Sequence, residues 1–123
     1  MDESESSKVN VLVVEDEWWI AEMIAGILSN AGYGVVGPAD TVEASLTLIE
    51  HQKIDAALLD VNLGTTMSYP VADALIARSV PTLLITGYHY TDLPPLYHGL
   101  RLLPKPTTPQ SILAALTQLL ISR

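Results

Sequence analysis

Cysteine is absent from this chain of 123 residues, which excludes a disulfide framework, a thiolate zinc site and a thiol nucleophile. Basic residues are scarce, because 6 lysines and arginines stand against 14 acidic residues, for a net charge of −8. This charge is a poor match for a phosphate backbone, so we expect no nucleic-acid partner. No apolar run approaches the ~18 residues of a membrane span, so no membrane association is expected.

The first eight residues, MDESESSK, also lack the positive start and the apolar run of a signal peptide. They are acidic and rich in serine, and we expect residues 1–8 to form a flexible tail. The whole chain is 49% hydrophobic and 16% charged, which is typical of a globular protein. These features predict a cytoplasmic protein with a single domain over residues 9–122.

Short apolar runs alternate with segments of helical periodicity along this domain. Five runs are predicted to be buried strands: residues 10–14, 35–38, 56–60, 81–86 and 101–104. Four helices are predicted between and after them: Glu17 to about Gly32, Glu43 to about His51, Pro70 to about Arg78, and Pro109 to about Ser122.

Capping residues and prolines refine the helix boundaries. Asp40 lies three residues before Glu43, as in a capping box, and Thr107 or Thr108 is expected to cap the last helix. Residues 87–99 contain two adjacent prolines, and proline is tolerated only in the first helical turn. We therefore expect only a short helix there. Within this segment, residues 91–99 are predicted to form at most two helical turns and to be the most mobile part of the fold.

Alternating strands and helices predict a doubly wound, flavodoxin-like (βα)₅ fold, with a parallel five-stranded sheet and a shortened fourth helix. Ligands of such sheets bind outside the carboxyl ends of the strands. The residues placed there are Glu15, Asp16, Glu17, Asp60, Thr86 and Lys105.

This set of side chains has a definite chemical capacity. Carboxylates from adjacent strands form the hard oxygen site that suits Mg²⁺. Asp60 ends an apolar strand, where Mg²⁺ and Lys105 would keep its carboxylate ionised. An ionised carboxylate can attack phosphorus and become an acyl phosphate. Thr86 would then donate to one phosphoryl oxygen, and Lys105 would pair with another.

Four motifs stand at these strand ends: VLVVEDE at 11–17, LLDVNL at 58–63, ITG at 85–87 and PKP at 104–106. In this order, from about Val9 to Ser122, they resemble the receiver domain of bacterial two-component response regulators. The resemblance implies that Asp60 accepts a phosphoryl group from a histidine kinase or a histidine phosphotransfer protein. It implies signalling by conformational change and no enzyme activity beyond self-phosphorylation and autodephosphorylation.

The resemblance also implies roles for the other residues of the site. Mg²⁺ would be held by Asp16 directly, by Glu15 through water, by Asp60 and by the backbone carbonyl of Asn62. Thr86 and Lys105 would bind the phosphoryl group, and the Lys105–Pro106 bond is usually cis in this family. The expected state is a monomer or a weak dimer.

Two departures from the common receiver pattern concern the switch. Receivers usually carry Tyr or Phe three residues before the lysine, where this chain has Leu102, and only 19 positions separate Lys105 from Thr86. The motif LITGY at 84–88, with DVNLG at 60–64 and PVADAL at 70–75, resembles the FATGUY-type subgroup, which includes stand-alone receivers. Our hypothesis is that Tyr88, moving with Thr86, replaces the usual aromatic switch.

Trp18 and Trp19 stand in the first turn of the first helix, beside the acidic pair. One of them is expected to pack, and an exposed tryptophan here, with Pro106 nearby, is a candidate partner anchor. The histidines are scattered along the chain and do not indicate a metal site.

Two other functions are consistent with parts of the pattern. A Mg²⁺-dependent aspartyl phosphatase of the haloacid dehalogenase type places Asp-x-Asp after its first strand and needs a cap for substrate. This chain has Glu15-Asp16-Glu17 there, its candidate nucleophile is on the third strand, and it has no cap-sized insertion. A receiver that binds partners without phosphorylation is the second alternative, and the intact Asp, Thr and Lys set argues against it.

Overall fold

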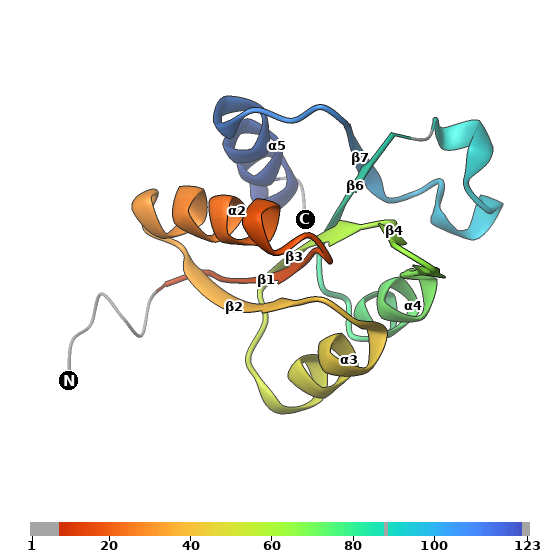
Figure 1. Cartoon of the computed structure of the whole chain (residues 1–123), viewed down its shortest axis with the longest axis horizontal. Coiled ribbons are helices and arrows are strands. Elements are labelled where there is room, and N and C mark those ends of the chain that lie inside the picture. Colours follow the sequence, from red (N-terminus) through yellow and green to blue (C-terminus); the bar gives the residue numbers. More distant parts are fainter. Residues whose placement is uncertain (1–7, 88, 122–123) are drawn as a thin grey trace.

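The computed structural model of the chain describes residues 8–87 and 89–121 (Figure 1). Its main sheet is parallel and five-stranded, in the order β2-β1-β3-β6-β7. The strands are β1 (Asn10–Val14), β2 (Gly34–Ala39), β3 (Ala56–Asp60), β6 (Thr82–Thr86) and β7 (Arg101–Pro104). The predicted flavodoxin-like sheet is confirmed, and the chain reverses its direction across the sheet between β1 and β3, where ligands of such folds bind.

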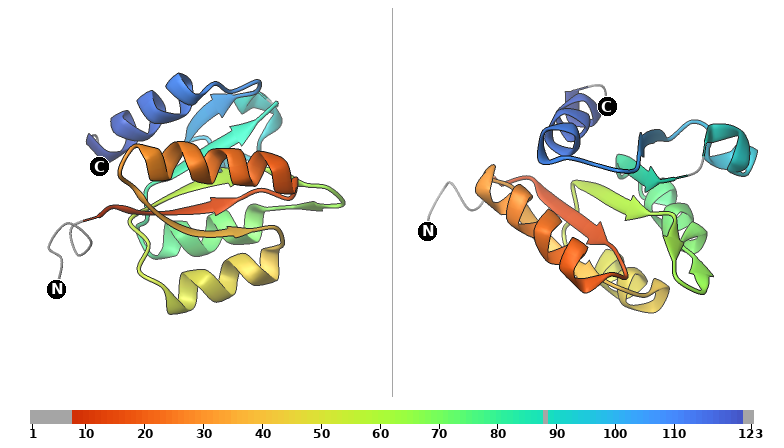
Figure 2. Two further views of the ribbon diagram at one scale, coloured as in Figure 1. Left: turned by 60° about the vertical axis from the view of Figure 1, so that its left-hand side comes forward. Right: turned by 45° about the horizontal axis from the view of Figure 1, so that its top comes forward.

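Helices cover both faces of the sheet (Figure 2). On one face lie α2 (Trp18–Asn30) and α5 (Pro109–Ile121), and on the other lie α3 (Val42–His51) and α4 (Tyr69–Ala77). Val11 and Val13 of β1 belong to the core cluster that includes residues of α2 and α5, whereas Leu12 and Val14 belong to the cluster that includes residues of α3 and α4. Successive side chains alternate between faces, so each of these apolar strands fills both halves of the core.

The helix starts partly follow the prediction. Asp40 was predicted to open the capping box of the second helix, and this is wrong, because the N-cap of α3 is Thr41. The Ala44 amide donates to Thr41 Oγ1 at 3.0 Å. At α5, the Ser111 amide donates to Thr108 Oγ1 at 3.0 Å and the Thr108 amide donates to Ser111 Oγ at 2.8 Å, so Thr108 is the cap.

The segment between β3 and α4 (Tyr69–Ala77) has regular structure of its own. Two short antiparallel strands, β4 (Asn62–Leu63) and β5 (Thr66–Met67), form a hairpin there. Gly64, at a φ of +77°, makes the turn that a side chain would strain. This hairpin brings the chain from Asp60 to the start of α4.

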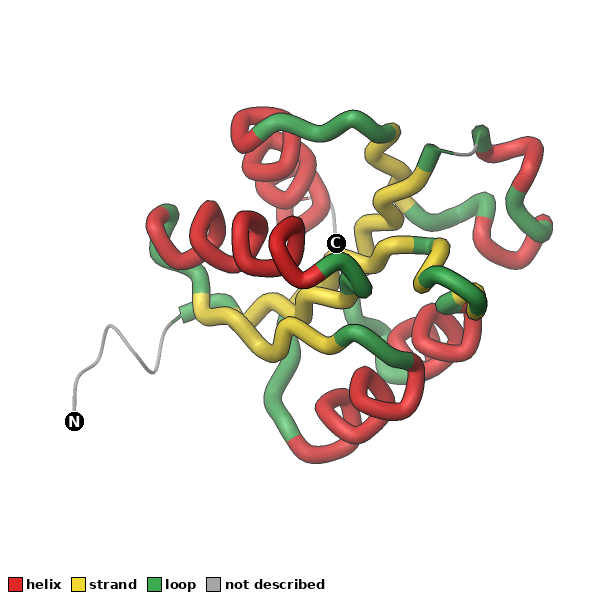
Figure 3. The backbone as a smooth tube through the Cα atoms, viewed as in Figure 1, coloured by secondary structure: helices red, strands yellow, loops and turns green. Residues whose placement is uncertain are grey.

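The predicted shortening of the fourth helix is confirmed. Between β6 and β7 the described residues form two 3₁₀ turns, η1 (Tyr90–Asp92) and η2 (Pro95–Tyr97), which Figure 3 shows at the edge of the fold. Pro94 and Pro95 lack the amides that a continuous helix needs, which explains the break.

Leu93 and Tyr97 anchor this irregular segment. Both side chains are buried in the cluster beside α4. The ring of Tyr97 stacks on Tyr69 with centroids 4.8 Å apart, and its hydroxyl donates to Asp73 Oδ1 at 2.7 Å. Burial, with this bond and the charge of Asp73, raises the pKa of Tyr97 to about 12. The contacts fasten η2 to α4; the high mobility expected of this segment stays a prediction.

Tyr97→Phe should lower the free energy of unfolding by about 1 kcal/mol, since it removes one hydrogen bond to an exposed carboxylate and keeps the ring stack. Chemical denaturation at pH 7 measures this change. Tyr33→Phe, on the opposite face of the sheet, is the control. An equal effect of the two substitutions would mean that the bond to Asp73 adds nothing.

Candidate functional site

Four strands deliver polar side chains to one edge of the sheet, as predicted. Glu15 and Asp16 follow β1, Asp60 ends β3, Thr86 ends β6, and Lys105 follows β7. Glu15, Asp60 and Thr86 are almost wholly buried, at 3%, 3% and 2% exposure. Such burial of acids at a strand end requires compensating contacts.

The acidic residues form a tight cluster. One carboxylate oxygen from each of Glu15, Asp16 and Asp60 lies within 4.8 Å of the others. A Cβ at Gly64 would come within 3.2 Å of Asp16 Oδ2, so the hairpin glycine leaves room for this carboxylate. The structure thus brings together the acids that sequence analysis assigned to a metal.

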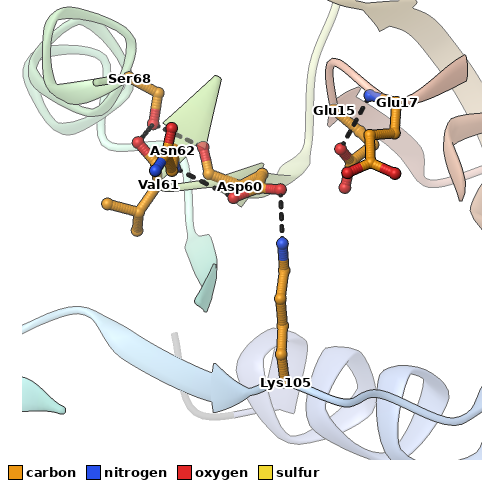
Figure 4. Close-up of polar contacts among 7 residues, drawn as sticks. All are labelled: Glu15, Glu17, Asp60, Val61, Asn62, Ser68 and Lys105. Carbon is orange, nitrogen blue, oxygen red and sulfur yellow. Dashed lines mark hydrogen bonds and ion pairs between the residues drawn. The ribbon is translucent and has the colours of Figure 1, made fainter. Parts of the chain in front are cut away.

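Both oxygens of Asp60 accept hydrogen bonds (Figure 4). Lys105 Nζ donates to Oδ2 at 2.8 Å, and the backbone amide of Asn62 donates to Oδ1 at 3.0 Å. A cavity of about 270 Å³, lined in part by Asp60, Asn62 and Lys105, opens beside this carboxylate. The Asp60 carboxylate, which is the candidate nucleophile, is therefore held in a fixed orientation and borders this cavity.

Thr86 and Lys105 are held as neighbours by the backbone. The amide of Lys105 donates to the carbonyl of Thr86 at 2.9 Å, which continues the pairing of β6 with β7. The Lys105–Pro106 peptide bond is cis.

The charged groups of the site have shifted pKa values with different causes. Burial raises the pKa of Glu15 to about 7; the hydrogen bond from the Glu17 amide opposes this rise, and the negative charge of Asp60 adds to it. Burial would lower the pKa of Lys105, but its bond to Asp60 and the charges of Asp60, Glu15 and Glu17 outweigh burial, so the net shift is upward. Lys105 therefore stays protonated.

This cluster fits a magnesium ion. Three carboxylates face one ammonium group, so negative charge remains in excess when all three are ionised. A hard divalent cation prefers carboxylate and carbonyl oxygens, which is the donor set present.

The tryptophans differ from the expectation that one of them packs. Neither tryptophan is buried, since Trp18 is 76% exposed and Trp19 is 56% exposed, although one was expected to pack. Trp19, Lys105 and Pro106 are among the residues lining an apolar cavity of about 430 Å³. Trp18 lines an acidic hollow with Glu15 and Asp16. Tyr88 lies outside the described residues, so its role as a switch stays a prediction.

Sequence reasoning missed Ser68. Its buried hydroxyl donates to the carbonyl of Asp60 at 2.7 Å. In the sequence, a serine just before a helix with Pro70 in its first turn is expected to be an ordinary N-cap. Only the folded hairpin shows that its hydroxyl points back to β3.

The site combines a buried carboxylate, a pair of acids and a lysine at the point where the strand order of a flavodoxin-like sheet reverses. This combination is typical of domains that accept a phosphoryl group. The model of the response regulator receiver domain family matches residues 11–117. The chain belongs to this family, and it is a signalling domain with a phosphoacceptor role in two-component systems. Receiver domains bind Mg²⁺ through acidic residues, and the cluster of Glu15, Asp16 and Asp60 is present here.

Curated relatives are longer proteins. The transcriptional regulatory protein PdtaR of Mycobacterium tuberculosis is 29% identical over 84 residues, which are 68% of this chain and 41% of that protein. The positive alginate biosynthesis regulatory protein of Pseudomonas aeruginosa is 37% identical over 79 residues, which are 63% of this chain and 32% of that protein. The chain thus matches less than half the length of either relative.

Solved structures agree over nearly the whole chain. A CheY-like receiver domain from Methanospirillum hungatei has a TM-score of 0.83 at 26% identity and covers 94% of this chain and 96% of its own. SdrG from Sphingomonas melonis has a TM-score of 0.78 at 39% identity, and the match covers 92% of this chain and 97% of that chain.

Among the described residues, no helix is long and apolar enough to cross a membrane.

Mg²⁺ affinity should rise about tenfold between pH 6 and pH 8, since Glu15, with a pKa of about 7, must lose its proton for the cluster to carry full negative charge. Titration of tryptophan fluorescence with MgCl₂ at each pH measures the affinity. Glu15→Gln should flatten this dependence, and Glu22→Gln, which removes an acid from α2, should keep it. A wild-type affinity that is constant over this range would contradict the assignment.

Proposed function

We propose that Asp60 is the phosphoacceptor of this receiver and that its phosphoryl group comes from a histidine kinase or a histidine phosphotransfer protein. The observation that carries the proposal is the environment of Asp60: a buried carboxylate bonded to Lys105 at 2.8 Å and clustered with Glu15 and Asp16. Membership of the receiver family favours this signalling role over the aspartyl phosphatase considered from sequence.

The transfer is a nucleophilic displacement at phosphorus. An Asp60 oxygen forms the new O–P bond as the P–N bond of the partner's phosphohistidine breaks. The electron pair of that bond stays with the imidazole, which is protonated on its other nitrogen and leaves neutral. The attacking carboxylate accepts a hydrogen bond from the Lys105 ammonium group.

The surrounding residues supply position and charge. We assign Asp16, Asp60 and the carbonyl of Asn62 as direct ligands of Mg²⁺, and Glu15 as a ligand through water. A bound Mg²⁺ would neutralise charge on the phosphoryl oxygens. Lys105 is long enough to turn from the carboxylate to a phosphoryl oxygen, and Thr86 donates from the end of β6 to another.

Asp60→Asn should abolish acid-labile labelling by a ³²P-labelled phosphohistidine donor protein with MgCl₂, because an amide cannot form an acyl phosphate. Asp40→Asn, which changes a nearby acid outside the cluster, should keep the label. Scintillation counting of the isolated protein before and after acid treatment gives the readout. Label that survives Asp60→Asn on another residue would overturn the assignment.

The apolar cavity between α2 and the start of α5 is our proposed docking site for the donor protein. It is lined by Trp19, Met23 and Pro106, and it also includes Glu15 and Lys105 of the acidic site. A partner segment seated there would hold its phosphohistidine next to Asp60. Exposed tryptophan is enriched among residues that dominate binding energy.

Trp19→Ala should lower kcat/KM for transfer from a phosphorylated donor protein by about tenfold, since it removes a central apolar contact. Transfer from phosphoramidate, which needs no docking surface, should not change. Leu96→Ala, an exposed apolar residue on η2, is the control. Equal losses with both donors would place Trp19 in the chemistry rather than in docking.

The signal itself is part of the same proposal. Leu102 packs against the core cluster beside α3 and α4 and has no polar tip to exchange between solvent and interior. Tyr88, two positions after Thr86, is therefore our candidate for the missing aromatic switch. A cytoplasmic location and a monomeric or weakly dimeric state belong to this proposal as well.

A further inference from the structure

The hydroxyl of Ser68 is turned away from the helix that it precedes. Ser68 is the N-cap residue of α4, yet its side chain makes no capping bond to that helix. Its hydroxyl lies 2.7 Å from the carbonyl oxygen of Asp60 and 3.2 Å from that of Val61 (Figure 4). An N-cap serine ordinarily binds an amide of the first turn with its hydroxyl, whereas here Pro70 has no amide and the Val71 amide donates to the Ser68 carbonyl at 2.9 Å.

The backbone amide of Ser68 binds the same part of the chain as its hydroxyl. Its amide donates to the carbonyl of Val61 at 2.9 Å. Amide and hydroxyl together bind the two carbonyls at the end of β3 and close residues 60–68 into a loop. The side chain is 1% exposed, so no solvent competes for these bonds.

The carbonyl that Ser68 holds belongs to the residue that carries the reacting carboxylate. Beyond Asp60 the pairing of β3 with β6 ends, and the last ladder contact is the Val61 amide on the carbonyl of Ile85 at 3.2 Å. The Asn62 amide, which orients Asp60 Oδ1, lies inside the loop that Ser68 closes. The carbonyl groups of both peptide units that flank Val61 are therefore bonded to Ser68.

We propose that Ser68 is a positioning residue for the phosphoacceptor: its hydroxyl fixes the Asp60–Asn62 backbone so that the carboxylate and the Asn62 carbonyl meet phosphorus and Mg²⁺ correctly. This inference rests on the proposed function of Asp60. Reacting groups displaced by a fraction of an ångström lose much of their rate, and residues that orient metal ligands affect affinity strongly.

Ser68→Ala should weaken Mg²⁺ binding and slow transfer from phosphoramidate, each by about tenfold. Ser45→Ala is a matched control, because the Ser45 hydroxyl is also buried and also donates to a carbonyl at 2.7 Å, in α3 away from the site. It should lose similar stability to denaturant and change neither measurement. In the metal-free proteins, the ¹³C shift of the Asp60 carbonyl should move upfield with Ser68→Ala and stay constant with Ser45→Ala.

Ser68→Cys is a second variant that keeps the test valid if Ser68→Ala does not fold, because the cysteine fills nearly the same space with a weak donor. It should reproduce the carbonyl shift and part of the loss in Mg²⁺ affinity. Folded Ser68 variants that match Ser45→Ala in Mg²⁺ affinity and rate would overturn the positioning role. Failure of the proposed function would look different, because the wild-type protein itself would then take no phosphoryl group on Asp60.

Discussion

The ion pair between Asp60 and Lys105 is the contact on which the site depends. A carboxylate at 3% exposure is unstable as an anion without a partner, and the Lys105 ammonium lies 2.8 Å from it. The pair spans from β3 across β6 to the end of β7, so it requires that all three strands end at the same level. Strand register, fixed by the pairings of Asp60 with Ile85 and of Thr86 with Pro104, meets that requirement.

The acids of the cluster differ in how their negative charge is compensated. Lys105 compensates one negative charge, and Asp60 accepts hydrogen bonds from that ammonium and from the Asn62 amide. Glu15, buried beside them with a single backbone amide to oppose the effect, has its pKa raised to about 7. Burial thus raises the proton affinity of Glu15, and a divalent cation bound to the cluster would compete with that proton.

Sequence alone predicted the sheet, the strand ends and the set of acids, threonine and lysine. Apolar runs and glycine or proline boundaries are local signals, and parallel strands bring their carboxyl ends together whatever the loops do. One error concerns a choice between neighbouring residues with similar chemistry. Asp40 and Thr41 are both good caps, and only backbone geometry selects Thr41. Ser68 and Tyr97 were missed because their partners, Asp60 and Asp73, are 8 and 24 positions away.

The irregular segment between β6 and β7 shows how contacts can substitute for a helix. Pro94 and Pro95 remove amides that an α-helix would use, so backbone bonds cannot hold the segment as one unit. Tyr97 replaces them with a ring stacked on Tyr69 and a bond to Asp73, both on α4. Tyr69 directly follows Ser68, whose hydroxyl is bonded to the backbone of Asp60. The start of α4 is therefore in contact both with η2, through a packed aromatic pair, and with the backbone of Asp60.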